Sequence, residues 1–117
     1  MYAYNTMQLM PSNTVREDEF IQLAQKGYRV EVVCTESAYK QHANWYGRWV
    51  IRAFDEETGR DKVLVTARKS GIGSRDVEPR YFRTLPGLFS FLHDLGIGAT
   101  VTVPTECGRR SVQGSWD

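Results

Sequence analysis

The histidines and cysteines are the residues best suited to catalysis or metal binding, and their spacing predicts neither. His42 falls in a polar stretch and His93 lies beside Asp94, without a cysteine or carboxylate at the spacing of zinc ligands. Cys34 sits in an apolar stretch where burial would raise its pKa and leave the thiol inert. The Gly71–Gly73 segment lacks the preceding strand and following helix of a phosphate-binding loop. The sequence therefore predicts a protein that is not an enzyme and uses no cofactor or metal.

Recognition is the second chemistry that the residue pattern suggests, and its candidates lie on one predicted hairpin. Residues 45–54 and 61–68 are expected to be strands, and the connection at 55–60 contains the glycine that a hairpin needs. Sorting the residues by parity gives an apolar face with Trp45, Trp49, Ile51, Ala53, Val63, Val65 and Ala67. The opposite face then carries Tyr46, Arg48, Val50, Arg52, Phe54, Lys62, Leu64, Thr66 and Arg68.

Two interpretations of this mixed face remain open. Cations interleaved with aromatic side chains can follow a phosphate backbone and stack on bases. The outer face of an antiparallel sheet is also polar in proteins that bind nothing there. A glycine- and serine-rich loop at 69–78 precedes two further cations, which extend the candidate surface. The candidate residues for binding nucleic acid or a partner are Tyr46, Arg48, Arg52, Lys62, Arg68, Arg80 and Arg83.

Two amphipathic segments are predicted to be helices that support this sheet. Thr14 and Glu17 have the spacing of a capping box, and Gly27 ends the segment, which predicts a helix over 15–26. Thr84 is expected to cap a second helix, in which leucines recur at helical spacing before Gly96. Further strands are expected at 28–34 and 99–103.

The predicted fold class is α+β: one antiparallel sheet of three to four strands with two helices on one face, in α-β-β-β-α order. We expect an N-terminal arm at 1–13, a single domain at 14–103 and a flexible C-terminal tail at 104–117. A homodimer through an unpaired strand edge or the arm is compatible with this layout.

Bulk composition narrows the class of protein further. The chain has 117 residues, of which 41% are hydrophobic and 25% charged, as in an ordinary globular domain. Its formal net charge of +1 is too small for a protein that coats DNA. No secretory signal or membrane-spanning stretch is visible, and the two cysteines are not expected to pair, so the sequence predicts a cytoplasmic protein without membrane contact.

Three stretches together resemble a known family: DEFIQLAQKGYRVEV, RWVIRAFDEETGRDKVLVTAR and RYFRTLPGLFSFLHDLGI. They are similar to small accessory proteins of plasmids and integrative elements, of the kind labelled partition-associated proteins of the ParC type, over about residues 18–97. This resemblance implies a non-catalytic protein of a mobile genetic element that binds DNA or a DNA-bound protein complex. The expected contact surface is the outer face of the sheet.

A second hypothesis belongs to a different functional class. Mobile elements also carry small inhibitors of host defence, including anti-CRISPR proteins, and a near-neutral chain with a mixed charged face suits a protein that occludes a host protein complex. Salt dependence distinguishes the two hypotheses. Binding to DNA weakens steeply with salt, whereas burial of an apolar patch does not.

Overall fold

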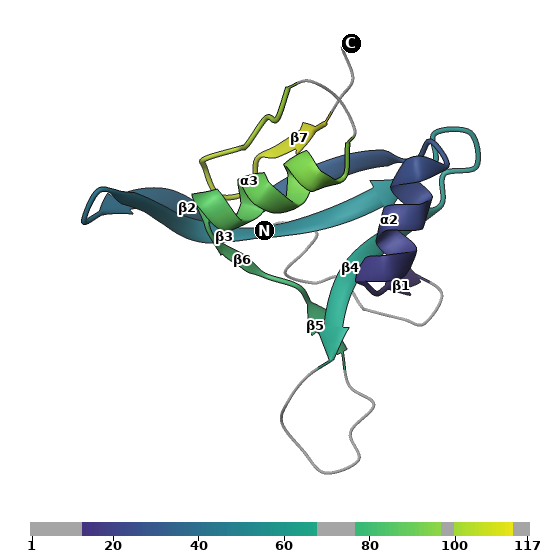
Figure 1. Cartoon of the computed structure of the whole chain (residues 1–117), viewed down its shortest axis with the longest axis horizontal. Coiled ribbons are helices and arrows are strands. Elements are labelled where there is room, and N and C mark those ends of the chain that lie inside the picture. The colour runs from purple at the N-terminus through teal and green to yellow at the C-terminus, as the bar shows by residue number, and fades with distance from the viewer. Residues whose placement is uncertain (1–12, 68–76, 97–99, 114–117) are drawn as a thin grey trace.

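A computed structural model describes residues 13–67, 77–96 and 100–113. In chain order, its elements are β1 (Thr14–Val15), α2 (Glu17–Gln25), β2 (Arg29–Gln41), β3 (Asn44–Phe54), β4 (Asp61–Ala67), β5 (Val77–Pro79), β6 (Phe82–Thr84), α3 (Leu85–Asp94) and β7 (Arg110–Val112). Figure 1 shows the long strands β2 and β3 running across the molecule, with α3 lying along them and α2 beside β4.

The strands form one mixed sheet of seven, which corrects the predicted fold class. The central order is β1-β4-β3-β2-β7, with β5 added to β4 and β6 added to β3. β1 pairs with β4 in parallel, and the other pairs are antiparallel. The prediction of three to four antiparallel strands in α-β-β-β-α order is therefore wrong. It missed β1 and β7, which at two and three residues are too short to show alternation.

On the edge away from β2, strand β3 changes partner along its length. Its C-terminal half pairs with β4, with Arg52 opposite Val63. Its N-terminal half pairs instead with β6, with Trp49 opposite Phe82. β4 meanwhile continues into its pairing with β5, and the Arg80 amide donates to the Leu64 carbonyl at 2.9 Å. The segment from β5 to β6 thus bridges the space that opens where β4 leaves β3.

Helix α2 forms close to the predicted range but begins differently. Thr14 is extended in β1 opposite Val63, and the N-cap is Arg16, which makes no capping hydrogen bond with its side chain. The capping box is therefore wrong, because pairing with β4 holds Thr14 in the sheet. Phe20 is fully buried, and Gly27 follows the helix with a φ of 103° that suits glycine.

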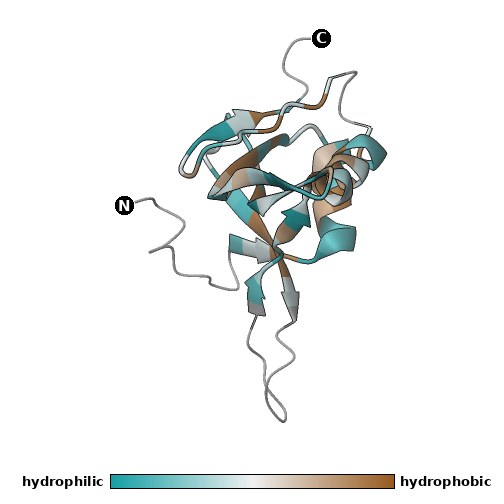
Figure 2. Cartoon of the chain, turned by 90° about the vertical axis from the view of Figure 1, so that its left-hand side faces the viewer, coloured by the Kyte–Doolittle hydropathy of each residue, from teal (hydrophilic) through white to brown (hydrophobic). Residues whose placement is uncertain are grey.

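Helix α3 has the predicted cap and apolar stripe. The Thr84 hydroxyl accepts a hydrogen bond from the Gly87 amide at 3.2 Å. Leu88 and Leu92 are at most 1% exposed, whereas Phe89 points outward and is 49% exposed. In Figure 2 the apolar residues gather where the strands and helices meet. α3 therefore contributes to the core while leaving one aromatic ring on the surface.

Both faces of the central sheet are buried, and the register assigns their residues. Trp49, Ile51 and Ala53 lie in the core with the helices, as predicted. Lys62 is opposite Ala53 and therefore lies on the same face of the sheet as Ala53. Alternate residues of a strand share a face, so Leu64 lies on that face too and belongs to the same core. The predicted parity of β4 is thus reversed. Val63, Leu64 and Val65 are consecutive apolar residues, so no alternation indicated which of them faces the helices.

Part of the segment expected to be a tail belongs to the fold. β7 pairs with β2, with Ser111 opposite Val32, and the Cys34 amide donates to the Arg109 carbonyl at 2.9 Å. A strand was expected at 99–103, but the described residues of that range, 100–103, form no strand. Of the arm expected at 1–13, residues 1–12 lie outside the described residues.

No helix in the described part of the chain combines the length and the apolar character needed to span a membrane.

The packing of α3 gives the first testable prediction. Leu92→Ala should lower the free energy of unfolding by ~2 to 5 kcal/mol, because it removes a fully enclosed side chain. Ser90→Ala, on the exposed side of the same helix, should change it by less than ~0.5 kcal/mol. Urea unfolding of both variants measures the difference. Equal midpoints for Leu92→Ala and the native protein would contradict the packing described.

Candidate binding groove

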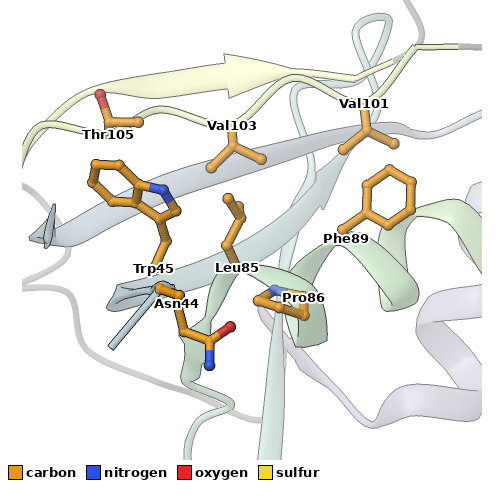
Figure 3. A pocket seen from close by; sticks show the side chains of 9 residues that line it. Asn44, Trp45, Leu85, Pro86, Phe89, Val101, Val103 and Thr105 are labelled. Carbon is orange, nitrogen blue, oxygen red and sulfur yellow. The ribbon is translucent and has the colours of Figure 1, made fainter. Parts of the chain in front are cut away.

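An apolar groove of about 600 Å³ opens between the tip of the β2–β3 hairpin, the start of α3 and the segment before β7. The hairpin contributes Ala43, Asn44 and Trp45, the helix contributes Leu85, Pro86 and Phe89, and the third wall has Val101, Val103 and Thr105. Figure 3 shows the Trp45, Leu85, Phe89 and valine side chains around one space. Trp45 is 44% exposed, so two large aromatic residues border the groove with much of their surface in solvent.

The third wall is held in place by polar contacts beneath it. The Trp49 indole nitrogen donates to the Pro104 carbonyl at 2.8 Å, and the Trp49 side chain is fully buried. The Thr102 amide donates to the Gln113 side-chain oxygen at 2.8 Å, while the Gln113 side-chain nitrogen donates back to the Thr102 carbonyl. These paired contacts fix the backbone between Val101 and Thr105 independently of any ligand.

The hairpin tip is an extension of two strands beyond the rest of the sheet (Figure 1). Tyr39 and Tyr46 stack on one of its faces at a ring separation of 5.8 Å. Trp45 occupies the other face, opposite Lys40. The turn places His42 and Ala43 at φ values of 52° and 70°, a conformation that favours glycine or asparagine. The tip thus holds strained backbone in position beside the groove.

Most of the predicted binding arginines are engaged within the molecule. Arg48 forms an ion pair with Glu36 at 2.8 Å and lies 4.6 Å above the centre of the Tyr81 ring. Arg80 forms an ion pair with Glu17 and lies against the Phe82 and Phe91 rings. Each of these guanidinium groups therefore has a carboxylate partner within the molecule, which balances part of its positive charge.

Arg52 is the centre of the strongest of these networks. Its Nε donates to Glu31 Oε1 at 2.6 Å, and its Nη1 donates to Asp61 Oδ2 at 2.9 Å. Arg110 approaches the same Glu31 oxygen at 3.8 Å. The Glu31 side chain is only 6% exposed, so the cations compensate a carboxylate that has lost its hydration.

The remaining predicted residues only partly share a surface with these arginines. Lys62 pairs opposite Ala53 and so lies on the face away from Arg52. Tyr46 is two residues from Arg48 on β3 and shares its face, where the Tyr46 ring stacks on Tyr39. Arg83 is exposed on β6, one residue before the helix cap. Arg68 lies outside the described residues. The geometry therefore separates Lys62 from Arg48 and Arg52, which sequence parity had grouped with it.

The two cysteines lie close together but in different environments. Cys34 is buried and donates to the Glu36 carbonyl, whereas Cys107 is exposed and donates to the Thr35 carbonyl. Burial, with the neighbouring Cys107 as a second cause, raises the pKa of the Cys34 thiol to about 11. Both thiols are free.

Sequence reasoning missed the groove, because its three walls are far apart in the chain. Trp45 had been assigned to the buried face with Trp49, and the helix stripe gave no sign that Phe89 would meet residues after 100. The sole sequence signal was an uncharged, apolar character shared by residues 101–104 and the start of α3.

In the described residues, no three histidine, cysteine or acidic side chains are arranged to hold a metal ion. Comparison with models of protein families, with curated proteins and with solved structures finds no match.

The Arg52 network predicts a structural cost for losing its cation. Arg52→Met should reduce the free energy of unfolding by about 3 kcal/mol, because the buried Glu31 loses its main partner. Arg83→Met, which removes an exposed cation, should have an effect below ~0.5 kcal/mol. Chemical denaturation of the two variants compares them. If both variants unfold at the native midpoint, the structural role assigned to Arg52 is contradicted.

The cysteine environments predict unequal reactivity. With an aromatic disulfide reagent at mildly alkaline pH, the native protein should react rapidly at Cys107 alone, because the Cys34 thiol is buried and stays protonated. Cys34 should react after unfolding. Absorbance of the released thiolate follows both steps, and Cys107→Ser serves as the control that abolishes the rapid phase. Rapid reaction of that variant would contradict the burial of Cys34.

Proposed function

We propose that this chain is a non-catalytic binding protein whose groove takes an apolar segment of a partner protein. The observation that carries the proposal is the exposure of Trp45 and Phe89, at 44% and 49%, on opposite sides of a preformed apolar groove. Exposed aromatic residues beside a pocket are typical anchors of protein interfaces. Insertion of an apolar side chain between them would remove both rings from water.

The groove is suited to binding because little of it has to be ordered when a partner arrives. Its third wall is fixed from below by the Trp49 and Gln113 hydrogen bonds, and the helix wall begins at the Thr84 cap. Binding to a preformed site loses less conformational entropy of side chains and backbone, so more of the interaction energy contributes to affinity. Occlusion of a host protein complex, as by an anti-CRISPR inhibitor, is one role that such a site would serve.

Binding of DNA or a DNA-bound complex receives less support from the geometry. The cations that would contact phosphate at Arg48, Arg52 and Arg80 already have carboxylate partners. The positive charge that would attract a phosphate is therefore already balanced in part by these carboxylates. The role of a mobile-element accessory protein stays a prediction that rests on the sequence resemblance.

A capture experiment with matched variants distinguishes the two roles. Tagged native protein, the double variant Trp45→Ser with Phe89→Ser, and Tyr39→Ser should each be exposed to host lysate with and without nuclease treatment. Tyr39 is an aromatic residue of comparable exposure on the opposite face of the same hairpin. We expect native protein and Tyr39→Ser to retain the same protein partner, and the double variant to bind it at least about tenfold more weakly.

The salt dependence of the captured complex completes this test. A groove complex should keep its affinity between low and moderate salt, whereas a DNA complex loses affinity with a logarithmic slope near −0.9 per phosphate contact. Recovery that disappears with nuclease, or a partner that the double variant holds as tightly as native protein does, would overturn the proposed function.

A further inference from the structure

The walls of the groove carry no charge of their own. The chain segments that form them, residues 43–45, 85–89 and 101–105, contain no aspartate, glutamate, lysine or arginine. An inserted apolar side chain would therefore meet apolar surface on three sides. Any charge preference of the groove has to come from residues at its border.

Lys40 is the cation placed by the sheet register at that border. It is opposite Trp45 in the antiparallel pair of β2 and β3. Side chains that are directly opposite share a face, with Cβ atoms about 5 Å apart. Lys40 is exposed, so its stem can lie along the Trp45 ring while its ammonium group stays in water.

The carboxylates of the neighbouring chain segments are engaged elsewhere. Glu36, on the same strand as Lys40, is paired with Arg48 at 2.8 Å. Glu106, which follows the third wall, approaches Arg109 at 3.4 Å. Within the described residues, Lys40 forms no ion pair with any carboxylate. The border of the groove beside Trp45 is thus positive and uncompensated.

We propose that the partner segment carries a carboxylate next to the apolar side chain that enters the groove, and that Lys40 binds this carboxylate. The inference rests on the proposed function and adds the chemistry of the partner to it. A carboxylate at this point gains a cation beside an apolar wall, whereas a basic residue there is repelled. Electrostatic complementarity of this kind selects among partners that share the same apolar anchor.

Peptides that differ in flanking charge test the preference directly. Fluorescein-labelled peptides with a central Leu-Leu-x-Phe core, in which glutamate, serine or lysine occupies x and the outer flanks, should be titrated with the full chain and followed by anisotropy. We expect the glutamate peptide to bind about twofold to fivefold more tightly than the lysine peptide, within the range of an exposed charge pair. Lys40→Glu should reverse this order, and Lys40→Met should remove it.

The controls separate this inference from the proposed function. Lys26→Glu makes the same charge change at the end of α2 and should leave the order of the peptides unchanged. If all the peptides bind native protein equally and bind the Trp45→Ser, Phe89→Ser variant more weakly, the groove is confirmed as the site and the role of Lys40 is overturned. If they bind native protein and that variant alike, both proposals fail. Self-association of the chain that requires Trp45 would show that a second copy occupies the groove and would overturn the inference about Lys40.

Discussion

The arrangement of the molecule depends on the indole ring of Trp49. The ring lies over Gly47, where a Cβ atom would stand 2.8 Å from the ring carbon Cη2, so a side chain at that position would collide with it. Across the sheet Trp49 is opposite Cys34 on one side and Phe82 on the other, and its nitrogen donates to the Pro104 carbonyl. One fully buried residue thereby joins β2, β3, β6 and the segment that forms the third wall of the groove. A smaller residue there would empty the core and leave the Pro104 carbonyl without its donor.

The charged face shows how an apparently functional pattern can have a structural cause. Glu31 is buried because β7 and β3 flank β2, and burial of a carboxylate requires nearby cations and hydrogen-bond donors. Arg52 and Arg110 supply these, and Asp61 occupies the second side of Arg52. The basic residues of this face therefore balance acidic residues that come from other strands. The number of basic residues in this part of the sequence therefore indicates ion pairing within the molecule more than binding of a negatively charged ligand.

Local patterns in the sequence predicted local structure well and assembly poorly. The Thr84 cap and the burial of Leu88 and Leu92 follow from contacts within one helix, so spacing alone was enough. Capping by Thr14 failed because strand pairing with Val63, about 50 residues away, competes with the helix for the same residue. Parity failed on β4 for a related reason: a sheet buried on both faces has apolar residues at consecutive positions. The groove could not be predicted from the sequence, because its three walls come together only when the strands have paired.

The pairing of β7 with β2 also has a consequence for how the protein is made. β2 and β3 are neighbours in the chain and can form their hairpin early, but β2 receives its second partner from residues about 80 positions later. Until then a synthesised fragment has an open strand edge, Glu31 lacks Arg110, and the Trp49 nitrogen has no Pro104 carbonyl to bind. Open edges of this kind template pairing between chains. The nascent chain is therefore exposed to aggregation during the interval between the synthesis of β2 and that of β7, and a chaperone that covers the β2 edge would protect it.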